Sequence, residues 1–168
     1  MNIPNTLAHR TAQATLTVHK PDGTPLAHQD VTVAQRKHKF LFGNTAWEII
    51  ALANGALKDE TKARAERISD RFFDLFNFAT LPFYWGGFEP ERGKPHTARI
   101  RTGAQAFAER GCVLKGHPLC WHTGTAPWLL ELSNAEILDA QLARIHRDVA
   151  DFAGLIDMWD VLNEVVIM

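Results

Sequence analysis

The chain has 168 residues and a mass of 18.8 kDa, which fits one domain or part of one. Its 18 Lys and Arg and 19 Asp and Glu give a formal net charge of −1, so no basic surface favours a nucleic-acid partner. A hydrophobic content of 46% with 22% charged residues is typical of a globular protein rather than a disordered one. No run approaches the ~18 apolar residues of a membrane span, and no apolar segment near the start indicates a signal peptide.

The first predicted element is a β-hairpin within residues 1–39. Two alternating runs supply β-branched residues between Thr15 and Val33, and a Pro-Asp-Gly turn separates them at 21–23. β-Branched residues favour strands, and Pro-Asp-Gly favours a tight turn. We expect this hairpin to be an N-terminal appendage to a larger domain over residues 40–168.

From residue 40 onward, strand patterns alternate with helix patterns. The predicted strands cover 40–43, 76–85, 113–121 and 156–163, and the predicted helices cover 59–76, 97–110 and 133–153. Such alternation predicts an α/β fold with a parallel sheet and helical crossovers. The strands start about 39 residues apart on average, so a closed (β/α)8 barrel would need roughly 310 residues. The chain therefore fits a half-barrel of the TIM-barrel type, with its first four strands.

Each predicted helix carries apolar residues at helical spacing. In the second helix, Ile100, Ala104 and Phe107 recur at intervals of four and three. The third helix opens at a capping box formed by Ser133 and Glu136. Its apolar stripe consists of Leu138, Leu142, Ile145, Val149 and Phe152. These stripes are expected to face the core.

Polar and aromatic residues gather where the predicted strands end. They are Tyr84 and Trp85 after the second strand, His117, Trp121 and His122 after the third, and Asp160, Asn163 and Glu164 after the fourth. Because active sites of parallel barrels lie at the carboxyl ends of the strands, we expect these side chains to converge. Aromatic faces stack on pyranose rings, and a carboxylic acid can protonate a glycosidic oxygen. The set therefore suits a sugar site.

The same motifs, taken in order, resemble glycoside hydrolase family 10, the endo-β-1,4-xylanases. The matching segments are GHPLCWH at 116–122, PW at 127–128, WDVLNE at 159–164, the opening FLFG at 40–43 and the EPERG turn at 89–93. The resemblance covers about residues 40 to 166. It implies a (β/α)8 barrel that hydrolyses xylan or a related hemicellulose with retention of configuration. Export to the periplasm or the exterior would follow from a polymeric substrate.

The resemblance also implies roles for individual residues. Glu164 would be the general acid/base, and Asn163 would bind the sugar 2-hydroxyl. His117 and Trp121 would line the subsite beside the scissile bond, and Asp160 would support the strand end from behind. Further candidates for substrate contact are His122, Trp85, Tyr84 and Trp128, for each of which a purely structural role is the alternative. No third ligand accompanies the two histidines at a metal-like spacing, so neither a metal nor a cofactor is expected.

Two departures from the family pattern matter. The second strand of the family usually runs T-x-E-N-E-x-K-W, but residues 80–85 read TLPFYW, so sugar binding on that side must differ. The family nucleophile is a Glu at the end of the seventh strand, and no residue of this chain can be assigned to it. We therefore expect a fragment, completed by a C-terminal half-barrel or self-associating through an open edge near Val161 and Val165. The alternative is a non-catalytic remnant or a weak carbohydrate-binding protein. Glu89 or Glu91 would supply the second carboxylate if the chain alone proved active.

Overall fold

The computed structural model describes residues 11–165, and the chain divides into two compact units, Met1–Arg36 and Lys37–Met168. No helix within 11–165 is both long enough and apolar enough to cross a membrane. The assignment of the hairpin and half-barrel to 1–39 and 40–168 stays a prediction. Cys112 and Cys120 are both free thiols.

The N-terminal unit contains only a small part of the expected hairpin. His19 and Pro25 form one isolated antiparallel bridge, closed by a turn in which Thr24 donates its backbone N–H to the Asp22 carboxylate at 2.9 Å. The second run forms no strand in the described part of this unit, where Val33 is 70% exposed. A two-stranded ribbon without a covered apolar face is marginal in water, which explains why the strand propensity of these runs produces only one bridge.

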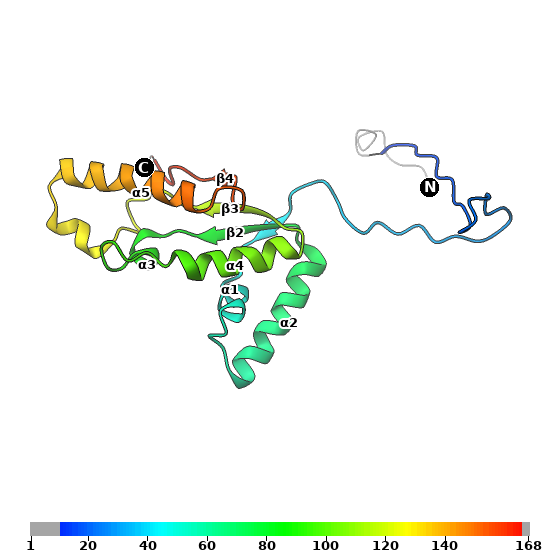
Figure 1. Cartoon of the computed structure of the whole chain (residues 1–168), viewed down its shortest axis with the longest axis horizontal. Coiled ribbons are helices and arrows are strands. Elements are labelled where there is room, and N and C mark those ends of the chain that lie inside the picture. Colours follow the sequence, from blue (N-terminus) through cyan, green and yellow to red (C-terminus); the bar gives the residue numbers. More distant parts are fainter. Residues whose placement is uncertain (1–10, 166–168) are drawn as a thin grey trace. The chain divides into compact units, whose positions relative to one another are not determined.

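The second unit is an open, parallel, four-stranded sheet with helices between the strands (Figure 1). Its strands are β1 Gly43–Asn44, β2 Phe78–Pro82, β3 Val113–His117 and β4 Met158–Trp159, in that order across the sheet. Its helices are α1 Trp47–Ala53, α2 Asp59–Leu75, α3 Trp85–Phe88, α4 Thr97–Glu109, the short 3-10 helix η2 Pro127–Glu131 and α5 Asn134–Asp151. The predicted alternation is confirmed, and the architecture is that of a partial (β/α) barrel.

The first strand differs from its prediction. It lies at 43–44, and Phe40, expected within a buried strand, is 76% exposed. β1 pairs only with β2, so one side of it has no neighbour among the described residues. The helix α1 that follows was not predicted, because seven residues are too few for periodicity to stand out.

Helix α4 buries the predicted stripe. Ile100, Ala104 and Phe107 are 2%, 0% and 1% exposed and pack in the core with residues of β2 and β3. Gly103 lies on the same face, where an added Cβ would come within 2.9 Å of the Ile50 side chain. The small residue therefore allows α4 to approach α1 closely.

Helix α5 contradicts most of the apolar-stripe prediction, although Phe152, at its C-terminal cap, is buried in the core as predicted. Leu138 and Leu142 are 58% and 48% exposed, whereas Arg144 and Asp148 are buried. The reason is that the two buried charges pair with each other and with groups at the strand ends, so the polar stripe faces inward. The exposed leucines, with the β4 edge, form an uncovered apolar surface. Val166 and Ile167, also expected at that edge, lie outside the described residues.

The capping box at the start of α5 is confirmed. Ser133 donates its backbone N–H to Glu136 at 2.8 Å, and the Ser133 hydroxyl accepts from the Glu136 N–H at 3.4 Å. Replacing Ser133 with Ala should lower the free energy of unfolding by about 1 kcal/mol, because it leaves a helix N–H without its acceptor. Urea unfolding measures this loss. Ser133→Asn is the control, since Asn also caps helices; an equal loss in both variants would contradict the capping role.

Candidate active site

The ends of β3 and β4 bring His117 and Asp160 together. His117 Nδ1 and Lys115 Nζ each lie 2.8 Å from the same carboxylate oxygen of Asp160. Burial raises the pKa of Asp160, but hydrogen bonds and charges from Lys115 and His117 outweigh it and leave that pKa below its usual value. Asp160 therefore remains ionised and fixes the orientation of the His117 ring.

Glu164 and Trp121 contact each other beyond the ends of the same two strands, β3 and β4. The Trp121 indole N–H donates to Glu164 Oε2 at 2.8 Å. The two segments stay paired beyond the regular strands through backbone hydrogen bonds, of which Asn163 N–H to Cys120 O, at 3.0 Å, is the last. Glu164 takes a left-handed backbone conformation, with a φ of 51°. The sequence motifs at 116–122 and 159–164 are thus brought side by side at the carboxyl edge of the sheet.

A hollow of about 410 Å³ adjoins this pair. Its lining residues are Cys120, Trp121, His122, Leu162, Asn163, Glu164 and Val165. Glu164 is the one carboxylate in that lining. His122 is exposed there and contacts the Thr123 hydroxyl at 3.1 Å. The hollow can therefore offer one acid, one amide and two rings to a ligand.

Tyr84 joins the site from β2. Its ring lies 5.6 Å from the ring of His117 and 5.6 Å from that of Trp121. On its other flank Trp47 stacks on Tyr84, with centroids 5.9 Å apart and planes at 24°. Sequence reasoning missed Trp47, although its place directly after the first strand could have identified it as a residue of the same edge.

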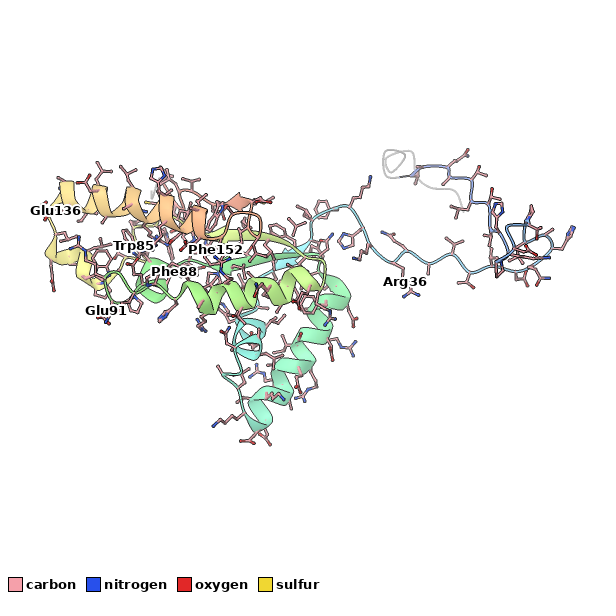
Figure 2. The ribbon with its side chains drawn as sticks, viewed as in Figure 1. Arg36, Trp85, Phe88, Glu91, Glu136 and Phe152 are labelled. Carbon is pink, nitrogen blue, oxygen red and sulfur yellow. The ribbon has the colours of Figure 1, made fainter. Side chains whose placement is uncertain are left out.

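Trp85 and Trp128 do not lie with these residues but together in a separate cluster, and their contact with substrate stays a prediction. Trp85 is only 5% exposed, packs edge-on against Trp128 at 5.5 Å, and sits over the guanidinium of Arg144. In Figure 2, Trp85 lies among the side chains between the helices. The physical reason is that Trp85 begins α3, which turns its indole away from the strand end and into a core cluster.

The two carboxylates considered for a second catalytic role are also placed elsewhere. Glu89 is 3% exposed and accepts hydrogen bonds from Trp85 Nε1, the Gly93 N–H and Arg147 at 3.2, 2.7 and 2.8 Å. Burial raises the pKa of Glu89, but these donors outweigh it and hold that pKa below its usual value. Glu91 pairs with Lys94 on the surface and, in Figure 2, lies at the periphery. Neither is near Glu164 in the lining of the hollow.

Arg144 connects this buried cluster to the strand ends. It donates to Leu119 O at 2.6 Å, to Phe83 O, and to Asp148 at 3.2 Å. Arg147 binds both Asp148 and Glu89 at 2.8 Å. Phe83 and Leu119 lie just after β2 and β3, so the Arg144 guanidinium holds the backbone that leads to Tyr84 and Trp121.

Stability should depend on pH through Glu89. Its lowered folded pKa contributes stability that is present above the ordinary carboxyl pKa of about 4.3 and is lost as pH falls through the folded value. Glu89→Gln should cost about 1–3 kcal/mol at pH 7 and less at pH 3, measured by urea unfolding. Glu91→Gln, at an exposed pair, is the control and should change little at either pH. A gap between wild type and Glu89→Gln that is constant with pH would contradict this assignment.

The arrangement of strands and motif residues corresponds to a known family. The sequence matches Glycosyl hydrolase family 10 over residues 48–168. The chain belongs to glycosyl hydrolase family 10. Within the described residues, no group of three or more His, Cys, Asp or Glu side chains is suited to hold a metal ion.

Curated relatives in family 10 match parts of the chain. "Endo-1,4-beta-xylanase A" of Thermotoga maritima is 38% identical over 68 residues, which cover 37% of this chain and 6% of the relative. "Endo-1,4-beta-xylanase B" of Thermotoga neapolitana is 29% identical over 84 residues, covering 49% of this chain and 24% of the relative. The chain thus spans a quarter or less of the length of these two relatives.

Solved structures in family 10 share the fold. Xylanase 10B of Thermotoga petrophila, solved in complex with xylobiose, superposes with a TM-score of 0.61 at 23% identity over 76% of this chain and 37% of its own. Native xylanase 10B of Thermotoga maritima gives a TM-score of 0.58 at 23% identity, over 74% of this chain and 41% of its own. The four strands therefore correspond to part of the family 10 barrel.

Proposed function

We propose that this chain is the acid/base-bearing half of a retaining endo-1,4-β-xylanase that acts on xylan or a related hemicellulose. The observation that carries the proposal is the Glu164 carboxylate, held at 2.8 Å by the Trp121 indole at the carboxyl edge of the sheet. Membership of family 10 and the names of its relatives support the substrate class.

Glu164 has the groups that proton transfer needs. The Trp121 indole N–H donates to Oε2 of Glu164, and Oε1 of Glu164 makes no hydrogen bond with any described residue. That free oxygen can donate a proton to the glycosidic oxygen and later accept one from water. Asn163, next to it in the same hollow, offers an amide to a sugar hydroxyl.

His117 would position the sugar. With its Nδ1–H held by the ionised Asp160, its Nε2 is left to accept a hydrogen bond from a hydroxyl group. Tyr84 and Trp121 supply ring faces beside it. These residues form one wall of a cleft.

The retaining route needs a second carboxylate about 5–5.5 Å from the first, as nucleophile. Glu164 is the one carboxylate lining the hollow. We propose that four further βα-units supply the nucleophile and cover the exposed Leu138, Leu142 and β4 edge. Association of two copies through the same edge is the alternative partner.

The absence of a second carboxylate from the lining also favours a second candidate, a sugar-binding protein without hydrolytic activity. A reducing-sugar assay on xylan separates the two functions. The 168-residue chain alone should release no reducing sugar from xylan. Addition of a C-terminal half-barrel should produce hydrolysis. Binding of xylo-oligosaccharides with no hydrolysis in either form would favour the sugar-binding candidate.

A further inference from the structure

Three aromatic rings form a continuous row along the carboxyl edge of the sheet. Trp47 stacks on Tyr84 at 5.9 Å, and Tyr84 lies 5.6 Å from Trp121. Each ring comes from a different strand end: Trp47 begins α1 after β1, Tyr84 follows β2, and Trp121 follows β3. The row therefore extends from the hollow at Glu164 across three strands, the direction in which a bound polysaccharide would have to run.

Trp47 differs from the other four tryptophans in its hydrogen bonding and exposure. The other four indole N–H groups all have acceptors: Glu89 for Trp85, Glu164 for Trp121, the Glu89 carbonyl for Trp128 and the Ile156 carbonyl for Trp159. The indole N–H of Trp47 has no acceptor among the described residues, and its side chain is 47% exposed. A ring used only to fill the core would be buried as Trp85 is, at 5%.

The chain near Trp47 carries an uncharged polar side chain, that of Asn44. Asn44, the last residue of β1, is exposed, and its Oδ1 accepts the Thr45 N–H at 2.8 Å, while its amide N–H groups donate to no described residue. The adjoining strand end at 80–85 carries no charged side chain. An open indole face, a free indole N–H and an amide donor suit a sugar ring, because its C–H face stacks and its hydroxyls accept hydrogen bonds.

Resting on the proposed function, we infer that Trp47 is a sugar-binding platform and forms a separate subsite for a β-1,4-linked pyranose chain, remote from Glu164 along the aromatic row. Stacking recognises the face of the ring and not its hydroxyl edges. A substituent on a hydroxyl that does not face the indole N–H or the Asn44 amide is therefore accepted as readily as an unsubstituted sugar.

The test is calorimetric titration of the chain with xylotetraose and with an arabinose-substituted xylo-oligosaccharide. Trp47→Ala should weaken both by the same factor, about tenfold, which corresponds to about 1.4 kcal/mol. Trp47→Phe, which keeps a stacking ring, should bind within about threefold of wild type, or about 0.65 kcal/mol. Phe40→Ala, which removes an exposed ring before the start of β1, is the matched control and should bind as wild type does.

A second measurement avoids any folding defect of the variants. In the wild-type chain labelled with ¹⁵N, the indole N–H resonance of Trp47, assigned by its absence in Trp47→Phe, should shift on titration with xylotetraose. Tight binding by wild type with an unchanged affinity in Trp47→Ala, or a stationary Trp47 resonance, would overturn the subsite while leaving the proposed function intact. No binding of either oligosaccharide by wild type would also overturn the subsite, whereas the proposed function would be overturned only if the completed barrel failed to hydrolyse xylan.

Discussion

Replacing Glu164 by Gln in the completed, active barrel should lower kcat on xylan by about 10²–10⁴-fold, the usual contribution of general acid–base catalysis. Gln keeps the size of the side chain and can still accept the Trp121 indole hydrogen bond. It cannot donate an acidic proton or accept one from water. Initial rates of reducing-sugar release measure the loss.

The proton-transfer role can be separated from a structural one. A substrate with a dinitrophenyl leaving group needs no protonation, so Glu164→Ala should still form the glycosyl-enzyme but release it slowly. Azide needs no general base, and it should restore turnover and appear in the product as a glycosyl azide. Glu109→Gln, an exposed carboxylate at the end of α4, is the matched control and should keep wild-type rates. Full activity in Glu164→Gln, or no response to azide, would remove Glu164 from the mechanism.

The largest loss of stability should come from Arg144→Met. The Arg144 side chain is 2% exposed, and that of its partner Asp148 is fully buried. Burial lowers the pKa of Arg144 and raises that of Asp148, so each needs the other to remain charged at low cost. Met fills a similar volume but leaves Asp148 without one of its partners and removes the donor to the Phe83 and Pro118 carbonyls. The Leu119 carbonyl still accepts from Gln141. We expect a loss of about 3–5 kcal/mol in the free energy of unfolding, measured with urea.

Arg71→Met provides the comparison for this substitution. Arg71 also lies on a helix and pairs with a carboxylate, Asp74, at 3.6 Å, but its side chain is 87% exposed. An exposed pair of this kind contributes at most about 1 kcal/mol, so the control should be nearly neutral. Similar losses in the two variants would show that the buried network does not stabilise the fold.

The sequence predicted the alternation of strands and helices because each element has a local signature. The α4 stripe of Ile100, Ala104 and Phe107 and the Ser133 cap are patterns within a few residues, and both are confirmed. The predicted orientation of α5 was wrong for its leucines. Two stripes with the same period lie on that helix, one of leucines and one containing Arg144 and Asp148. Only the partners at the ends of β2 and β3 decide which stripe turns inward.

The site could be predicted as far as the strand ends could be located. His117, Trp121, Asp160 and Glu164 belong to two motifs whose strands are neighbours, so their convergence follows from a parallel sheet. Trp85 could not be placed, because one further residue beyond Tyr84 starts a helical turn that reverses the direction of its side chain. The contributions of Asn163 and His122 to substrate binding stay predictions.

Arg144 donates hydrogen bonds to the main-chain oxygens of Phe83 and Leu119. These bonds do not depend on which side chains those two residues carry. Every amino acid has the same main-chain carbonyl, so a substitution at either position leaves the acceptor of the Arg144 hydrogen bond in place. A partly exposed position of segment 80–85, such as Tyr84, can therefore change while the backbone keeps its place, whereas the buried Leu81 and Phe83 remain bound by packing. A barrel anchored in this way is free to evolve a new ligand preference at one strand end without first rebuilding its scaffold.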